Sequence, residues 1–139
     1  MNAPRDAKPS SGNGELILMV DDEKSVLDMA SIVFELSGYR VIAADNAMLA
    51  FEIYEKRRKD IDVVLLDLAM PIMDGIQLSH ILVEIDPGVK IIVSSGQATP
   101  MKELELRRLG IQYFLPKPYN VTQLLTVVHN VIHPGETAA

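Results

Sequence analysis

The chain has 139 residues, of which 48% are hydrophobic, and it carries a formal net charge of −6. The length is that of a single domain, and the hydrophobic fraction excludes an intrinsically disordered chain. The absence of cysteine excludes disulfides and cysteine-ligated zinc, and the acidic balance argues against binding to nucleic acid or an anionic membrane over the whole surface.

Both ends of the chain are expected to lie outside the domain. Residues 1–14 are rich in Pro, Ser, Gly and Asn, which predicts a flexible lead-in, and they lack the apolar core of a secretory signal. Residues 134–139 predict a short tail, which leaves 15–133 as the domain. No apolar run approaches the about 18 residues that indicate a membrane helix. The absence of cysteine favours a reduced compartment, so we expect a cytoplasmic protein.

The first half of the chain predicts three strands and two helices. In order, these are a strand at 15–20, a helix at 25–36, a strand at 39–44, a helix from 45 or 46 to about 59, and a strand at 61–67. The strands are short, continuous apolar runs, which is typical of strands buried on both faces. The helices carry apolar residues at helical spacing, and Gly38 is of the type favoured directly after a helix.

The second half continues the same alternation. It predicts a helix from 74 to about 85, a strand at 90–95, a helix from 99 to 110, a strand at 112–117 and a helix from 120 to about 132. Thr99 before Pro100 is a helix start signal, and Asn120 is a suitable cap. Five strands alternating with five helices predict an α/β fold with a parallel sheet covered on both faces.

Polar side chains follow four of the five predicted strands, at the edge where parallel sheets bind their ligands. They are Asp21, Asp22, Asp67, Ser94, Ser95 and Lys117. Three neighbouring carboxylates repel one another, and a hard cation such as Mg²⁺ relieves this through oxygen ligands. An aspartate can accept a phosphoryl group, whose oxygens a hydroxyl and an ammonium can bind. The edge therefore predicts magnesium-dependent phosphoryl chemistry.

Four motifs, in this order, resemble the receiver domain of two-component response regulators. They are VDDE (20–23), DLAMPIMDG (67–75), SSG (94–96) and FLPKP (114–118), and the resemblance extends from about residue 15 to 133. It implies a doubly wound, flavodoxin-like (βα)5 sandwich of three layers with strand order 2-1-3-4-5. It also implies a signalling domain of a phosphorelay, phosphorylated by a histidine kinase or a histidine phosphotransfer protein, rather than an enzyme.

The resemblance assigns an acceptor and an ion site. Asp67 would be the phosphoacceptor that forms 4-aspartylphosphate. Asp21 and Asp22 would hold Mg²⁺, or Mn²⁺ in its place, together with Asp67 and the backbone carbonyl of Ala69, and Asp22 is the preferred direct ligand. Ala69 and Gln97 occupy positions that in the family tune how fast water attacks the phosphoaspartate.

The resemblance also assigns the switch. Lys117 would bind the phosphoryl group, and its peptide bond to Pro118 would be cis. Ser95 would be the switch hydroxyl and Phe114 the switch aromatic, so that phosphorylation re-biases the surface of the fourth helix, fifth strand and fifth helix. Ser94 competes with Ser95, because alternation sends adjacent strand residues to opposite faces. Ser95 is preferred, because a small residue follows it as in the family.

Three alternatives stay open. A phosphatase of the haloacid dehalogenase type also uses an aspartate and Mg²⁺, but it needs a second aspartate where this chain has Ala69. A flavin phosphate binder would meet repulsion from the acidic run at 21–23. A degenerate receiver would keep the fold and act only as a protein-binding module.

The output is not encoded in any recognisable motif. We expect either a single-domain regulator that acts on an unknown protein target or a receiver cut from a longer protein such as a hybrid kinase. The predicted last helix lacks the alternating charges of salt-bridged receiver dimers, which favours a monomer or a weak homodimer. Neither nucleic acid nor membrane is expected as a direct partner.

Overall fold

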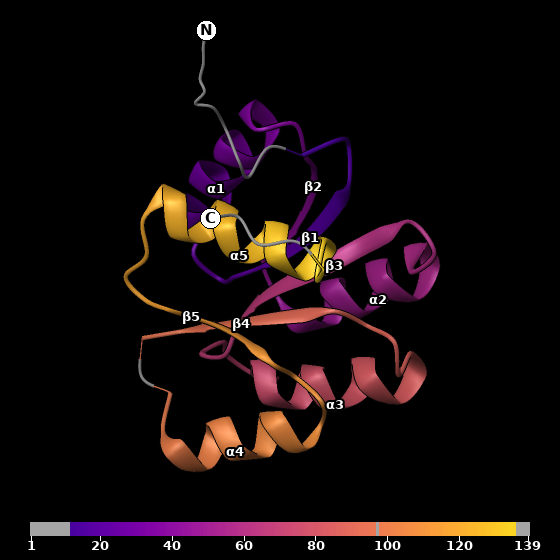
Figure 1. Cartoon of the computed structure of the whole chain (residues 1–139). Coiled ribbons are helices and arrows are strands. Elements are labelled where there is room, and N and C mark those ends of the chain that lie inside the picture. The colour runs from indigo at the N-terminus through magenta and orange to yellow at the C-terminus, as the bar shows by residue number, and fades with distance from the viewer. Residues whose placement is uncertain (1–11, 97, 136–139) are drawn as a thin grey trace, which may run out of the picture.

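A computed structural model of the chain describes residues 12–96 and 98–135. Five strands and five helices alternate along this part of the chain (Figure 1). They are β1 (Leu16–Val20), α1 (Lys24–Leu36), β2 (Arg40–Ala44), α2 (Ala47–Arg57), β3 (Ile61–Asp67), α3 (Gly75–Ile85), β4 (Ile91–Ser95), α4 (Pro100–Arg108), β5 (Tyr113–Pro116) and α5 (Val121–Ile132). All the predicted elements are confirmed, each bound lying within two residues of its expected place.

The strands form one parallel sheet in the order β2-β1-β3-β4-β5. This order confirms the doubly wound topology, because the chain runs outward from β1 in one direction and then from β3 in the other. The register places Asp67 of β3 opposite Ser94 of β4, and Ser95 opposite Pro116 of β5. The carboxyl ends of the central strands therefore meet at one edge.

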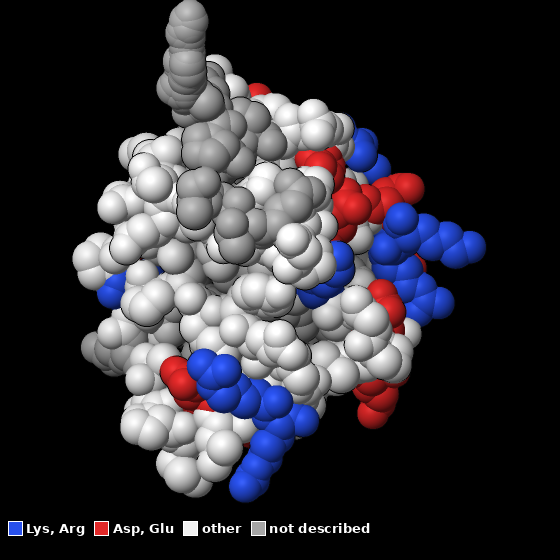
Figure 2. Space-filling model, viewed as in Figure 1, with Lys and Arg blue, Asp and Glu red and all other residues white. Residues whose placement is uncertain are grey.

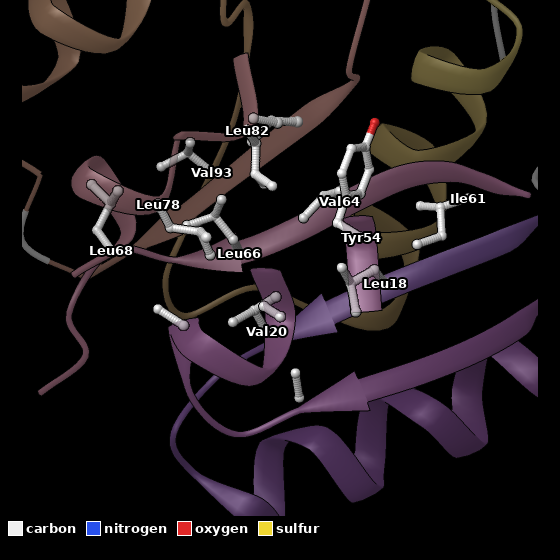
Figure 3. Packing of buried hydrophobic residues seen from close by; sticks show 14 of the residues in the cluster. Leu18, Val20, Tyr54, Ile61, Val64, Leu66, Leu68, Leu78, Leu82 and Val93 are labelled. Atoms are coloured by element: carbon white, nitrogen blue, oxygen red, sulfur yellow. The ribbon is translucent and has the colours of Figure 1, made fainter. Parts of the chain in front are cut away.

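Two hydrophobic cores fill the space on either side of the sheet. Leu66 and Val93 pack with Leu78 and the other buried residues of α2, α3 and α4, as Figure 3 shows. The neighbouring strand residues Leu65 and Ile92 belong to the second core, which α1 and α5 cover. Strand residues alternate between the two faces of the sheet. The face on which a side chain at the carboxyl edge lies therefore follows from counting residues along its strand.

Local signals in the sequence set several helix ends. Gly38 follows α1 with φ 93°, a left-handed conformation that glycine adopts without steric cost. Asp74 with Gln77 and Asn120 with Gln123 form reciprocal capping boxes at the starts of α3 and α5. The loops after β3 and β5 therefore lead into fixed helix starts beside the carboxyl edge.

The ends of the predicted domain are only partly covered by the structure. Residues 1–11 of the predicted lead-in, 136–139 of the predicted tail and the tuning position Gln97 lie outside the described residues. Gly12 and Gly14 donate backbone hydrogen bonds to Ser37 and Gly38 after α1. In 12–96 and 98–135, no helix combines the length and apolar character that a bilayer crossing requires. The face in Figure 2 is largely uncharged, with acidic and basic side chains in small mixed groups.

Candidate functional site

The predicted site residues converge at the carboxyl edge of the sheet. Asp21 and Asp22 directly follow β1, Asp67 is the last residue of β3, and Ser95 is the last residue of β4. Lys117 follows β5. Each side chain thus lies at or directly after the carboxyl end of a strand, where open parallel sheets bind their ligands.

Three carboxylates form the acidic part of the site. Asp21, Asp22 and Asp67 each offer a carboxylate oxygen, and these oxygens lie within 4.8 Å of one another. Asp21 is 2% and Asp67 5% exposed, whereas Asp22 faces solvent. Oxygen ligands that are partly buried and partly open to water suit Mg²⁺, which keeps several of its waters. The described residues of this site therefore fit the ion that the sequence predicts.

Lys117 supplies the opposite charge. Its Nζ lies 3.1 Å from Oδ2 of Asp21 and 3.5 Å from Oδ1 of Asp67. Burial by itself lowers the pKa of this ammonium, but the hydrogen bond and charge of Asp21, with the charge of Asp67, outweigh it and leave the pKa raised. The Lys117–Pro118 peptide bond is cis, as expected. The ammonium is therefore held charged between two carboxylates.

The surroundings of Asp67 disfavour its ionised form. Burial raises its pKa above the ordinary value, and the charge of Asp21 raises it further. Lys117 and a long hydrogen bond of 3.4 Å from the Ala69 amide to Oδ1 act in the opposite direction without cancelling these effects. Because the ionised form of Asp67 is disfavoured in these surroundings, an added cation would stabilise it.

Asp21 is held more firmly than Asp67. Its Oδ1 accepts a hydrogen bond from the Glu23 amide at 2.9 Å, and its Oδ2 accepts one from Lys117 at 3.1 Å. Both of its oxygens therefore already have a donor. Among the described residues, the exposed carboxylate of Asp22 has no comparable contact to Lys117, and its role as the preferred direct ligand of an ion stays a prediction.

Ser95 and Phe114 share a cavity at the β4–β5 end. Both line a space of about 240 Å³ together with Glu103 of α4. Phe114 is half-buried, and the Arg107 guanidinium carbon lies 4.6 Å from its ring centroid. The two residues predicted to move in concert are thus neighbours, and the space between them borders α4.

Tyr119 was not singled out by the sequence, and Ser94 was passed over in favour of Ser95. Burial raises the phenol pKa of Tyr119. The charge of Lys117 lowers this pKa, and the charges of Asp21 and Asp67 raise it. Ser94 is buried and stands opposite Asp67 in the register. Parity counted along both strands would have placed Ser94 on the Asp67 face, but only if the register had been known.

The tuning and carbonyl positions stay predictions. The Ala69 amide donates to Asp67, and its exposed side chain lies beside the acidic group. No described contact involves its carbonyl oxygen, which was expected to bind the ion. Gln97 lies outside the described residues, so its orientation is not part of the structure.

Comparison with known proteins now decides the family. The sequence model described as the response regulator receiver domain matches residues 17–129. The chain belongs to this family. Receiver domains act in two-component and phosphorelay signalling, and magnesium and aspartylphosphate are typical of them. The phosphatase and flavin-binder alternatives lose their support.

Individual relatives agree with the family match. Chemotaxis protein CheY of Thermotoga maritima is 31% identical, over 85% of this receiver and 98% of its own length. A methylesterase/glutaminase of Paramagnetospirillum magneticum is 34% identical over 78% of this receiver. This chain spans only 29% of that enzyme. The shared part is therefore the receiver and not the enzyme's whole length.

A solved structure supports the same conclusion. The CheX–CheY complex of Borrelia burgdorferi, which contains BeF₃ and Mg²⁺, has a chain that aligns with a TM-score of 0.79 and 27% identity. The alignment covers 84% of this receiver and 87% of that chain. The five-stranded fold and strand order of this receiver are thus those of the CheY group.

Proposed function

We propose that this receiver accepts a phosphoryl group on Asp67, with Mg²⁺ bound beside it. One observation carries the proposal: Lys117 Nζ lies 3.1 Å from Asp21 and 3.5 Å from Asp67, next to a group of three carboxylates within 4.8 Å. Positive charge on one side and ion ligands on the other are what a transferring phosphoryl group requires.

The chemistry is an in-line displacement. An Asp67 oxygen forms a bond to phosphorus, and the bond from phosphorus to the donor breaks, its electron pair leaving with the donor nitrogen or oxygen. Mg²⁺, held by Asp21, Asp22, Asp67 and the Ala69 carbonyl, would neutralise charge on the phosphoryl oxygens. Lys117 binds a phosphoryl oxygen as a point charge.

The switch follows from the new oxygens. Ser95, at the end of β4, moves to donate a hydrogen bond to the phosphoryl group, and Phe114 occupies the space that opens between them. These two residues already line one cavity with α4. The surface formed by α4, β5 and α5 is thereby re-biased between two states, which a protein target reads.

The phosphodonor, the output and the cellular location are proposed from what is typical of receiver domains. The phosphodonor is a sensor histidine kinase or a histidine phosphotransfer protein in the cytoplasm, and the output is contact with another protein. The receiver acts as a monomer or a weak homodimer. Analytical ultracentrifugation with and without a phosphodonor tests that last point directly.

Intact mass after incubation with Mg²⁺ and acetyl phosphate tests the acceptor. We expect a gain of one phosphoryl group in the wild type. The gain should be absent in Asp67→Asn and in a sample with excess chelator. A matched exposed variant, Asp28→Asn on α1, should be phosphorylated like the wild type.

Each other outcome points elsewhere. No gain in a folded protein that binds Mg²⁺ would mean that only a protein donor is accepted, which a phosphorylated kinase domain can test. No gain and no Mg²⁺ binding would leave a degenerate receiver that serves as a binding module. A gain that survives in Asp67→Asn would show that another residue is the acceptor.

A further inference from the structure

Ser94 and Asp67 point to the same face of the sheet. They are paired in the register of β3 and β4. Leu66 and Leu68, on either side of Asp67, and Val93, before Ser94, all belong to the core under α2, α3 and α4 (Figure 3). By alternation, Asp67 and Ser94 both face the opposite side. The two side chains are therefore neighbours on adjacent strands.

The Ser94 hydroxyl is a buried group that lacks a partner. Ser94 is 3% exposed, and its Oγ has no hydrogen bond within the described part of the chain. Ser79 of α3 shows the usual situation, because its equally buried hydroxyl donates to the Gly75 carbonyl at 2.7 Å. Buried hydroxyls without a partner are rare and call for an explanation.

The Asp67 carboxylate is short of close donors. Its Oδ1 receives the Ala69 amide at 3.4 Å and the Lys117 ammonium at 3.5 Å, both long for charged hydrogen bonds. Adjacent strands lie about 4.8 Å apart, so serine and aspartate side chains on one face can reach each other by a change of rotamer. The Ser94 hydroxyl, which has no acceptor, thus lies near the Asp67 carboxylate, which has no close donor among the described contacts.

We propose that the Ser94 hydroxyl donates a hydrogen bond to the Asp67 carboxyl group and shortens the lifetime of the phosphoaspartate. The inference rests on the proposed function and deepens it. Ser95 binds the phosphoryl group from the other face of β4, whereas Ser94 acts on the carboxyl group to which the phosphoryl group is attached. The two serines therefore have separate roles.

The direction of the effect follows from the chemistry of hydrolysis. Water attacks phosphorus and loses a proton to solvent, and the bond from phosphorus to the Asp67 oxygen breaks. The electron pair of that bond passes to Asp67, which becomes a carboxylate while inorganic phosphate leaves. A donor to the carboxyl group stabilises the charge that develops there. Ser94 thereby favours the unphosphorylated carboxylate.

The test compares phosphoaspartate lifetimes in Ser94→Ala, Ser79→Ala and wild type. Each protein is phosphorylated with acetyl phosphate, the donor is removed, and the phosphorylated fraction is followed by intact mass, in Mg²⁺ and after addition of excess chelator. We expect roughly a three- to tenfold longer lifetime in Ser94→Ala, the range that one hydrogen bond accounts for. Ser79→Ala should decay like the wild type.

Urea unfolding separates this role from a packing role. Ser94→Ala removes the proposed hydrogen bond to Asp67, so it should lower the free energy of unfolding of the wild type and leave that of Asp67→Ala, which lacks the acceptor, unchanged. Ser79→Ala should lower the free energy of unfolding in both backgrounds, because its hydroxyl donates to the Gly75 carbonyl. A Ser94→Ala protein with higher stability and an unchanged lifetime overturns the inference. If Ser94→Ala does not fold, Ser94→Cys, a weak donor of similar shape, should show an intermediate lifetime, and a wild-type lifetime there overturns it equally.

The two proposals fail in distinguishable ways. A wild type that gains no phosphoryl group from any donor overturns the proposed function and this inference together. A wild type that gains one on Asp67, with equal lifetimes in all variants, overturns only the role of Ser94.

Discussion

At the scale of single residues, Asp67 combines burial with an adjacent negative charge. Its carboxylate is 5% exposed and close to that of Asp21, and both facts raise its pKa. A folded-state pKa above the unfolded value means that ionised Asp67 weakens folding at neutral pH, and that the loss disappears as pH falls through the folded pKa. The proposed phosphoacceptor is thus a residue whose ionised form destabilises the fold.

Asp67→Asn should therefore raise the free energy of unfolding in urea at neutral pH without Mg²⁺. The difference from wild type should narrow on acidification, because protonation neutralises Asp67 in the wild type. Exposed Asp28, which forms an ion pair with Lys24 at 3.6 Å, supplies the control, and Asp28→Asn should change stability by less than about 0.5 kcal/mol. An Asp67→Asn protein less stable than wild type would contradict this account.

Tyr39 should make the stability of the fold depend on pH in the alkaline range. Burial, with the charge of Glu15, raises its pKa to about 12. Neutral Tyr39 therefore contributes stability below the unfolded pKa near 10, and this contribution is lost as pH rises toward 12. Tyr39→Phe keeps the ring that meets Phe34 edge-on and should lose less stability over that window, by on the order of 1 kcal/mol. Urea melts at stepwise increasing pH measure the slopes, and equal slopes would rule the idea out.

At the scale of elements, the start of α3 fixes the acceptor strand. The Gly75 amide donates to the Leu68 carbonyl at 3.0 Å, and a Cβ at Gly75 would lie 2.5 Å from the Asp67 carbonyl oxygen and from Leu66 Cδ1. Two backbone segments meet here with no room for a side chain. The Asp-Gly that ends the second motif is thus a packing requirement as well as a helix start.

Gly75→Ala should destabilise the fold by about 1–3 kcal/mol in urea unfolding, because backbone atoms must shift to admit the methyl group. The matched control is Gly88→Ala, where the nearest atom to the new Cβ is 3.5 Å away, an ordinary contact. The control should stay within about 0.5 kcal/mol of wild type. Equal effects at both positions would show that the close approach at Gly75 is not important.

At the scale of the whole molecule, one sheet holds the entire site together. The acidic residues come from β1 and β3 and the ammonium from the end of β5, so the site exists only when the central strands are paired. A ligand that needs all of these groups binds the folded chain and not the unfolded one. Ion binding and folding are therefore linked.

Mg²⁺ should raise the midpoint of thermal unfolding, corresponding to about 2.7 kcal/mol at roughly 100 times the Kd. Asp22→Ala should largely abolish the shift, because this exposed carboxylate is the proposed direct ligand of the ion and its removal leaves both cores untouched. Circular dichroism melts in Mg²⁺ and in chelator at matched ionic strength provide the measurement. A full shift in Asp22→Ala would remove Asp22 from the ion site.

The elements, the fold and most residues of the candidate site could be predicted from local sequence patterns. Alternating apolar runs and helical spacing gave all ten elements, because burial of apolar surface acts on each segment locally. Polar residues at strand ends were predicted to meet, because parallel strands bring their carboxyl ends to one edge. Asp21, Asp67 and Lys117 do so, at 3.1 and 3.5 Å.

The distances between the site residues, and the faces of the sheet on which they lie, depend on tertiary packing. The Asp21 carboxylate accepts hydrogen bonds from the Glu23 amide and from the Lys117 ammonium. The bond from Lys117 joins residues 96 positions apart. Ser94 lies beside Asp67 because of the register between β3 and β4, which depends on the packing of two cores and not on either strand alone. Sequence patterns state which residues are buried, whereas pairing between distant strands settles which of them meet.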